Sequence, residues 1–451
     1  MNFGIFYEHQ LPRAAGADWD YDAERRLYQE ALEQVELADR VGIDYVWEVE
    51  HHFLEEYSHS SAPEVFLAAC SQRTKRIRLG HGITLMAPRY NHPARVAERI
   101  AALDLVSNGR VEWGTGESAT AVEMGGFLID PADKESMWRE GAEQAANMLA
   151  MRPYPGFDGQ WFAMPCRNIV PKPVQKPHPP MWVACSRRET IHRAARAGIG
   201  ALAFAFVKPE QAAQWVEDYY AIIKSEECVP IGHTVNPNIA VVTGMSCHRD
   251  EDEAIRRGLN GFRFFGYSLG HYALFGEHRP GVTNLWDRFL QVKDKMPDNA
   301  GRGGIGTPAQ LREHLRGYEK AGIEQVIFVQ QAGATRHEHI CESIETFAAE
   351  VMPEFAEREA AYAERKRREL APAIEAALAR KPRLPPLAEA AIPVVEALGR
   401  QGVSPLQGTS DRGGAIPIAT ADLLAERPGL AATAVAHAAY EAEAKATATS
   451  R

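Results

Sequence analysis

Several features that mark secreted, membrane-spanning or metal-stabilised proteins are missing from this sequence. The six cysteines are scattered without a Cys-x-x-Cys pair, which is typical of free thiols in a reducing compartment. The longest stretch without Asp, Glu, Lys or Arg, residues 228–248, is interrupted by prolines, asparagines and a histidine, so it is no membrane span. No positively charged and then apolar leader opens the chain. The sequence therefore predicts a cytoplasmic protein without a membrane partner.

A surplus of basic residues is also missing. Lys and Arg number 50 against 60 Asp and Glu, which gives a formal net charge of −10. Proteins that bind nucleic acids neutralise phosphates with clustered Lys and Arg, and no such block occurs here. Because 45% of the 451 residues are hydrophobic and 24% are charged, the composition is that of an ordinary globular protein.

What is present is a regular alternation of short apolar runs with amphipathic helical stretches over the first 350 residues. Eight such alternations predict parallel strands joined by crossover helices, and we expect a (β/α)8 TIM barrel, with a doubly wound sheet as the alternative. The eight expected strands are Phe3–Phe6, Tyr45–Val49, Ile77–Leu85, Arg110–Gly114, Met181–Ala184, Ala201–Phe206, Ile239–Met245 and Gln325–Val329.

Two segments and the tail depart from this alternation. Pro153–Pro180 is rich in Pro, Gly and aromatics and is predicted to be an insertion. Phe264–Gly306 is long, rich in Gly and aromatics, and is expected at the active-site end of the barrel, with an open, aromatic-rich loop over Phe264–Tyr272. The predicted division is a barrel over residues 1–355 and a helical and irregular C-terminal extension over 356–451, which is rich in Ala and Pro.

The strongest candidate for chemistry is Glu50-His51-His52-Phe53, directly after the second strand. Residues at the C-terminal end of a barrel strand face the active site, and histidine moves protons near neutral pH. The alternatives are a loop in which both histidines are simply hydrogen-bonded, and a metal site. A metal site is disfavoured because the first strand ends in the single His9, although ligand-type residues are dense at His51, His52, Glu55, Glu56 and His59.

Two further segments are candidates for ligand binding. Glycines flank His81 within the third strand, which indicates a bulge or a close approach of a ligand. After the fifth strand, Cys185-Ser186-Arg187 precedes a helix, where free N–H groups, a hydroxyl and arginines suit a phosphate. The alternative there is plain capping of the helix by Ser186, with Glu189 completing a capping box. A nucleophilic Cys185 is disfavoured, since no base lies beside it in the sequence.

Taken together and in this order, the motifs resemble the bacterial luciferase-like flavin-dependent monooxygenase family over about residues 1–355. The residues that carry the resemblance are Glu50–Phe53; Thr74, Ile77, Gly80, His92 and Pro93; Ala97, Glu98, Leu103, Asp104, Ser107, Gly109, Arg110, Gly114 and Gly116; Glu123 and Gly126; Gly306–Pro308; and Phe347–Pro353.

The resemblance implies a two-component flavin-dependent monooxygenase. Reduced FMN from a separate flavin reductase and O2 would form a C4a-peroxyflavin that oxygenates a small organic substrate. His51 matches the catalytic histidine. The resemblance also implies that Gly82 and Ile83 support the flavin ring, often through a non-proline cis bond. The positions that match contacts near the flavin phosphate are Cys185, Ser186, Arg187 and, from the fourth helix, Arg139.

The sequence also departs from the family, and alternatives remain. Luciferase has a reactive cysteine and an arginine where this chain has Gly116 and Glu117, so light emission is not implied. An acidic Glu117 near a phosphate is unfavourable unless it is paired or turned away. The alternative enzyme is an oxidoreductase of the same fold that uses cofactor F420. The alternative from another class is a catalytically silent flavin-binding scaffold. The resemblance further implies a homodimer.

Overall fold

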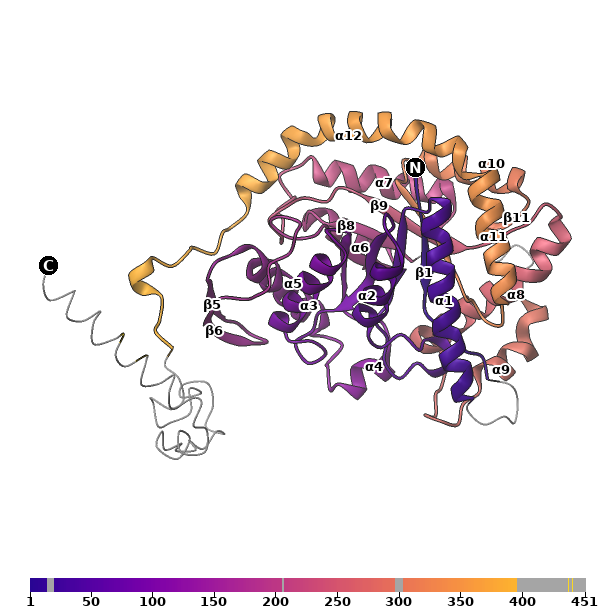
Figure 1. Ribbon diagram of the computed structural model, residues 1–451, viewed down its shortest axis with the longest axis horizontal. Coiled ribbons are helices and arrows are strands. Elements are labelled where there is room, and N and C mark those ends of the chain that lie inside the picture. The colour runs from indigo at the N-terminus through magenta and orange to yellow at the C-terminus, as the bar shows by residue number, and fades with distance from the viewer. Residues whose placement is uncertain (14–19, 205–206, 297–302, 396–436, 438–439, 441–451) are drawn as a thin grey trace, which may run out of the picture. The chain divides into compact units, whose positions relative to one another are not determined.

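Eight parallel strands close into a barrel in the computed structural model, which describes residues 1–13, 20–204, 207–296, 303–395, 437 and 440 (Figure 1). Around the barrel the strand order is β1-β12-β9-β8-β7-β4-β3-β2. These strands are β1 (Asn2–Tyr7), β2 (Tyr45–Glu48), β3 (Arg78–Leu85), β4 (Val111–Gly116), β7 (Met181–Cys185), β8 (Gly200–Ala203), β9 (Ile239–Gly244) and β12 (Gln325–Val329). The predicted (β/α)8 barrel and its eight strands are confirmed, except that residues 205–206 of the sixth expected strand lie outside the described residues.

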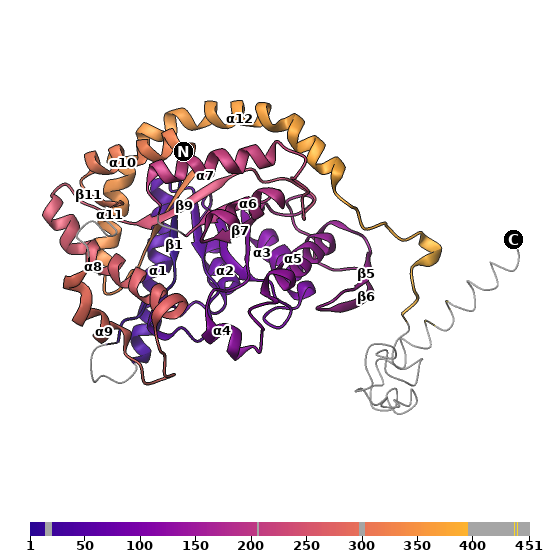
Figure 2. The same ribbon diagram turned by 180° about the vertical axis from the view of Figure 1, so that it is seen from behind.

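Helices surround the barrel and connect its strands (Figure 2). They are α1 (Tyr21–Val41), α2 (Pro63–Arg73), α3 (Pro93–Val106), α4 (Ala121–Gly126), α5 (Lys134–Ala150), α6 (Arg188–Arg196), α7 (Pro209–Ile223), α8 (Glu251–Gly270), α9 (Leu285–Val292), α10 (Pro308–Ala321), α11 (His337–Glu350) and α12 (Met352–Arg380). Short elements are the single turns η1 (Glu55–Tyr57), η3 (Lys293–Lys295) and η4 (Glu389–Ala391), the π turn η2 (His271–Phe275), and the strands β5 (Tyr154–Asp158), β6 (Ala163–Arg167), β10 (Ser246–Cys247) and β11 (Ile305–Gly306).

Local sequence sets several of these boundaries. At α10, Thr307 accepts from the N–H of Gln310, whose side chain accepts from the N–H of Thr307, and Pro308 occupies the first helical turn. The same helix ends at Gly322, which adopts a left-handed φ of 85° that only glycine takes without strain.

The segment Phe264–Tyr272 is not the open loop that we expected. Residues up to Gly270 continue helix α8, and Phe264 and Phe265 are buried in the core. A glycine inside the helix permits this packing, because a Cβ at Gly261 would lie 2.3 Å from the carbonyl oxygen of Ala332. The aromatic residues here therefore serve packing first, as is common for large apolar side chains.

The long helix α12 passes the N-terminal ends of β1 and β12, on the side away from the predicted active site (Figure 1). Phe355 packs edge-on against Phe3 of β1, at 5.6 Å between ring centroids. Glu324, directly before β12, accepts hydrogen bonds from Tyr362 at 3.0 Å and lies 3.1 Å from the ammonium of Lys366. The first compact unit accordingly comprises residues 1–154 and 167–386. The predicted boundary at residue 355 falls inside α12, and the division there stays a prediction.

The second unit comprises residues 155–166 and 387–451. In its described part it holds most of the two-stranded β5–β6 sheet, within the expected insertion, and the turn η4. Among the described residues of both units, no helix combines the length and the apolar character that crossing a membrane requires.

Candidate active site

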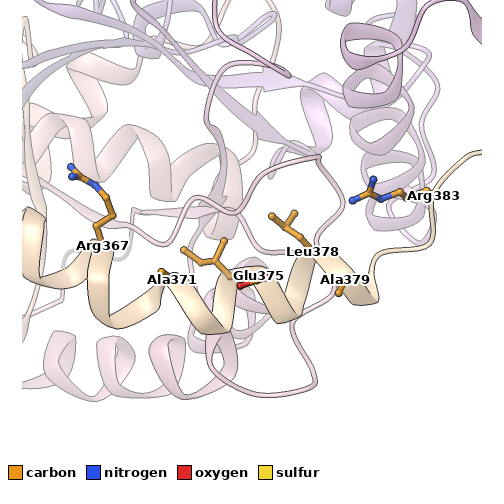
Figure 3. Close-up of a pocket in the computed structure, with 7 residues that line it drawn as sticks. Arg367, Ala371, Glu375, Leu378, Ala379 and Arg383 are labelled. Carbon is orange, nitrogen blue, oxygen red and sulfur yellow. The ribbon is translucent and has the colours of Figure 1, made fainter.

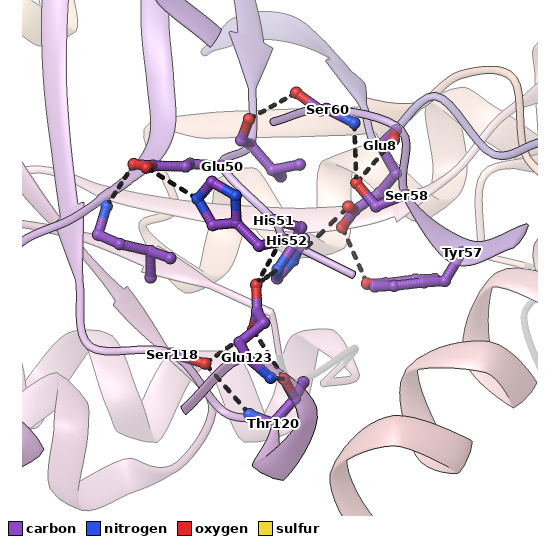
Figure 4. A network of polar contacts seen from close by, with 12 residues as sticks. Glu8, Glu50, His51, His52, Tyr57, Ser58, Ser60, Ser118, Thr120 and Glu123 are labelled. Carbon is purple, nitrogen blue, oxygen red and sulfur yellow. Dashed lines mark hydrogen bonds and ion pairs between the residues drawn. The ribbon is translucent and has the colours of Figure 1, made fainter. Parts of the chain in front are cut away.

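His51 lies directly after β2, at the C-terminal end of the barrel, between two carboxylates from other segments (Figure 4). Its Nδ1 is 2.8 Å from Oε1 of Glu123 on α4. Its Nε2 is 3.6 Å from Oε2 of Glu8, which follows β1. Burial lowers the pKa of His51, but the two carboxylates outweigh burial and raise that pKa to about 9. His51 is therefore held as a cation at neutral pH.

Glu123 is the more firmly held of the two carboxylates. Its side chain is fully buried and also accepts hydrogen bonds from the hydroxyls of Ser118 and Thr120 and from the N–H of His52. Burial alone would raise the pKa of Glu123, yet the charge of His51 and these donors lower it to about 2. Glu123 thus stays ionised and fixes the orientation of the imidazole.

Glu8 is the group that titrates closest to neutral pH. Its Oε1 accepts from the hydroxyl of Tyr57 at 2.8 Å, while its buried Oε2 has no hydrogen-bond partner and lies 3.6 Å from Nε2 of His51. Burial raises the pKa of Glu8 to about 7, although His51 and Tyr57 act in the opposite direction. The carboxyl group of Glu8 and the imidazole of His51 form an acid–base pair once their side chains close the 3.6 Å gap to hydrogen-bond distance.

The second histidine of the motif, His52, makes contacts that hold the loop after β2 in place. His52 contacts Oε1 of Glu50 at 3.2 Å and stacks on the ring of Tyr90. Glu50 in turn accepts from the N–H of Leu85 and from the side chain of Asn91. These contacts tie the loop after β2 to the end of β3, and so they position His51.

A further buried ion pair lies next to Glu8. His9 contacts Glu48 at 2.9 Å and Gln331 at 3.0 Å, and Ser60 donates to Glu48. These residues follow or end β1, β2 and β12, so the pair joins three neighbouring strand ends. His9 was considered only as evidence against a metal site, and no role was predicted for Glu8. The available signal was the position of both residues directly after the first strand.

Residues with a strained backbone conformation cluster at the C-terminal end of the barrel. Seven described non-glycine residues have a positive φ, and five of them lie directly after barrel strands or in the loops that follow. These five are His9, Phe53, Glu55, Ser118 and Gln331. Because left-handed non-glycine residues cluster at functional sites, their distribution supports an active site here.

Gly82 and Ile83 lie in β3, where the register with β4 shifts between His81 and Thr84. The bulge that the glycines indicated is therefore present. The three cis peptide bonds of the described residues all precede proline, so the expected cis bond at Gly82–Ile83 is wrong. The support of a flavin ring by these two residues stays a prediction.

The segment predicted to contact a phosphate joins β7 to α6. Ser186 and Arg187 are exposed, directly before the helix. Ser186 does not cap this helix as the alternative proposed, because the N-cap is Arg187, whose N–H donates to the hydroxyl of Thr190. An exposed hydroxyl and guanidinium at the start of a helix fit a phosphate group.

The Cys185 side chain points away from that position. It is fully buried, its thiol contacts the carbonyl oxygen of Thr190 at 3.3 Å, and burial raises its pKa to about 12. We expect iodoacetamide at pH 8 to leave Cys185 unmodified in the native protein and to modify it in denaturant, because the thiolate is the reactive form. Peptide mass spectrometry measures this, and rapid native labelling of Cys185 would contradict the buried placement.

Glu117 is paired rather than free. It lies directly after β4, and its Oε1 accepts from Arg193 of α6 at 2.7 Å. Arg193 also contacts Glu135 at 2.9 Å and lies 5.2 Å from the ring centroid of Trp138. Arg193 was not among the predicted residues, and only the barrel geometry brings it to Glu117. Arg139 is exposed on α5, and its role in cofactor binding stays a prediction.

A surface depression lies away from His51, and the described residues offer no candidate for a metal site. A depression of about 550 Å³ runs along α12, opposite to the His51 end, lined by Arg367, Ala371, Ile374, Glu375, Leu378, Ala379 and Arg383 (Figure 3). Within the part of the chain that the structure describes, no group of three His, Cys, Asp or Glu side chains is arranged to hold a metal ion.

Comparison with known proteins agrees with this geometry. Residues 1–325 match the sequence profile of a family described as luciferase-like monooxygenase. The oxygenase component of the flavin-dependent trigonelline monooxygenase of Acinetobacter baylyi is 25% identical over 75% of this chain and 92% of its own length. The F420-dependent glucose-6-phosphate dehydrogenase of Amycolatopsis mediterranei is 29% identical over 66% of this chain and 88% of its own. The crystal structure of the monooxygenase RslO1 from Streptomyces bottropensis superposes with a TM-score of 0.63 at 25% identity, covering 79% of this chain and all of that one.

Proposed function

Since the chain belongs to the luciferase-like monooxygenase family and is an oxidoreductase, we propose that it is the oxygenase of a two-component system that uses reduced FMN and O2 to oxygenate a small organic substrate. The observation that carries the proposal is the Glu8–His51–Glu123 arrangement at the C-terminal end of the barrel. The name of the relative from Acinetobacter baylyi, an oxygenase component, supports a separate flavin reductase as partner.

The residues at this end of the barrel suit a flavin mononucleotide. The N-terminus of α6 with Ser186 and Arg187 would hold the phosphate, and the acidic Glu117 is neutralised by Arg193. Reduced FMN, when bound, supplies the electrons for the activation of O2.

The role of the protein's own residues is to manage protons. His51 is a cation whose Nδ1–H donates to Glu123, which keeps its ring in one orientation, and whose Nε2–H faces Glu8. Glu8, with a pKa of about 7, returns a proton to His51 or removes one from it. The pair can therefore act as acid or base near neutral pH without a change in the backbone.

The proposal is tested by the reoxidation of reduced FMN in oxygenated buffer, followed by stopped-flow absorbance with and without the protein. We expect the protein to bind reduced FMN and to delay the return of oxidised-flavin absorbance, because a closed site stabilises oxygen adducts against decay. Reoxidation of bound flavin at the free-solution rate would contradict a monooxygenase. The relative from Amycolatopsis mediterranei supports F420 as the second candidate, and binding of F420 without binding of reduced FMN would favour it.

The Glu117–Arg193 pair leads to a separate prediction about the phosphate. Glu117→Gln is expected to tighten FMN binding about three- to tenfold while riboflavin binding stays the same, because the substitution removes the negative charge that neutralises Arg193 of α6. Titration of flavin fluorescence measures both ligands. Glu135→Gln, which removes the other and far more exposed partner of Arg193, is the matched control and should have a smaller effect. Equal gains for FMN and riboflavin would show that the pair does not act through the phosphate.

The proposal includes a homodimer in the cytoplasm. Apolar side chains of α2 and α3 are exposed, namely Val65 at 67%, Leu105 at 45% and Val106 at 55%, which supports an interface on these helices. The six cysteines, all among the described residues, form no disulfide bond, as is usual in a reducing compartment. Sedimentation of the purified protein measures the oligomeric state.

A further inference from the structure

A π turn closes helix α8 beside the His51 site. The turn η2, His271–Phe275, contacts α4, which carries Glu123. The segment that follows is fastened to the loop after β2, because Oε1 of Glu55 contacts Nε2 of His278 at 3.0 Å and accepts from the N–H of Gly281 at 2.8 Å. Single π turns are rare and are frequent at functional sites.

Four buried polar atoms in this region have no hydrogen-bond partner. They are Oη of Tyr272, Nε2 of His271, Nδ1 of His278 and Oε2 of Glu55. Tyr272 and His271 are only 7% and 3% exposed. Because nearly all buried polar groups in folded proteins are paired, four orphans on neighbouring residues indicate a position for a ligand or for ordered water.

Three of these four atoms, on Tyr272, Glu55 and His278, are of two kinds. The hydroxyl of Tyr272 can donate a hydrogen bond. Oε2 of Glu55 can only accept, and so can Nδ1 of neutral His278, whose Nε2–H donates to Glu55. Tyr272 and His278 pack at 5.0 Å between ring centroids, so donor and acceptor share one small volume. A hydroxyl group satisfies both kinds, because it accepts one hydrogen bond and donates another.

The orphan cluster connects to the acid–base pair through one aromatic ring. Tyr57 lies 6.2 Å from Tyr272 and 5.6 Å from His51, between ring centroids, and donates to Glu8. Phe265 also packs on Tyr57, at 5.8 Å. A small molecule held at the cluster would therefore lie beside the proposed reaction site, against aromatic side chains.

We propose that Tyr272, Glu55 and His278 form the specificity site for the hydroxyl group of a phenol or alcohol substrate, an inference that rests on the proposed monooxygenase function. A plain hydrocarbon would leave the four polar atoms unpaired, which is costly in a buried site. A carboxylate substrate at Tyr272 would be repelled by Glu55 and Glu56, whose charges both act on the hydroxyl of Tyr272. Tyr272 is thus a substrate-positioning residue, and the acid–base work stays with Glu8 and His51.

The test measures binding alone and needs no flavin reduction. Isothermal titration compares p-cresol, which donates and accepts, with p-xylene, which has the same shape without the hydroxyl, and with p-toluate, the matching anion, each with and without oxidised FMN. We expect p-cresol to bind about tenfold more tightly than p-xylene and p-toluate. Equal affinities for p-cresol and p-xylene would mean that the cluster holds ordered water only and would overturn the proposal, as would tighter binding of p-toluate.

Two conservative variants show which side chain is responsible for the preference for p-cresol over p-xylene. Tyr272→Phe should reduce the p-cresol preference about five- to tenfold and leave p-xylene binding within about twofold. Tyr267→Phe, in the adjoining helix α8 and packed against Phe275 and Phe289, is the matched control and should keep the preference. A p-cresol preference that survives Tyr272→Phe would overturn the assignment. If p-cresol binds as expected but the flavin reoxidation test fails, the subsite stands as a binding site and only the proposed oxygenation falls.

Discussion

Replacement of His51 by alanine is expected to lower substrate turnover about 10²- to 10⁴-fold, the range in which a positioned acid or base contributes. The expectation follows from the placement of His51 between Glu8 and Glu123, which holds a proton at the mouth of the barrel. Flavin affinity should change less than about threefold, because the proposed phosphate contacts lie after β7 and not on the β2 loop. Steady-state kinetics with a flavin reductase and flavin titration measure the two quantities separately.

The matched control for this variant is His248→Ala. His248 follows β10, lies 3.6 Å from Glu342 of α11, and takes no part in the His51 network. It should keep wild-type turnover and wild-type flavin affinity. A His51→Ala enzyme with turnover within about threefold of the wild type would remove His51 from the chemistry. Parallel losses of turnover and of flavin affinity would instead mean that His51 maintains the shape of the site.

The barrel could be predicted because its signal is local and repeated. Each strand is a short apolar run followed by a helix, and eight consecutive repetitions of this pattern leave few alternative folds. The two-residue strands β10 and β11 could not be predicted, since the pairing of Ser246 with Ile305 joins segments far apart in the chain. The aromatic segment after Phe264 was misjudged because glycines such as Gly261 usually favour loops, whereas here Gly261 permits a close contact between a helix and a backbone carbonyl.

Only those residues of the site that a single local motif identifies could be predicted from the sequence. His51 was identified because it directly follows a strand. Its partners Glu8 and Glu123 follow other strands, and only closure of the barrel brings the three side chains together. The same limit explains the missed Arg193: its spacing from Glu117 in the sequence carries no signal, while α6 places the two side chains at 2.7 Å.

The second large effect concerns stability. Glu123→Gln is expected to lower the free energy of unfolding by about 2–3 kcal/mol near pH 6, because a pKa of about 2 in place of the usual 4.5 corresponds to about 3 kcal/mol of stabilisation of the ionised form. The raised pKa of His51 reports the same ion pair, so the two contributions are not added. Denaturant unfolding followed by circular dichroism measures the difference.

The pH dependence of this difference distinguishes the ion pair from a packing defect. The contribution of Glu123 is present above about pH 4.5 and is lost as the pH falls toward 2, because its pKa is lowered in the folded state. The contribution of His51 is complete below about pH 6.5 and is lost as the pH rises through 9, because its pKa is raised. Wild type and Glu123→Gln should therefore differ most between about pH 4.5 and 6.5 and converge on both sides.

Glu8 changes stability with pH in the opposite direction to Glu123. Its pKa is raised to about 7, so its ionisation opposes folding as the pH rises through that value. Because Glu8 is present in both proteins, its contribution to the difference in unfolding free energy largely cancels. Glu338→Gln is the matched control, because Glu338 pairs with Arg336 and also has a pKa lowered to about 2, yet both side chains are exposed to solvent. Solvent screens such a pair, so this variant should leave the unfolding midpoint unchanged. A Glu123→Gln difference that stays constant from pH 3 to 10 would show that Glu123 stabilises the protein through its hydrogen-bonding shape alone, and the cationic state of His51 would then have to be abandoned.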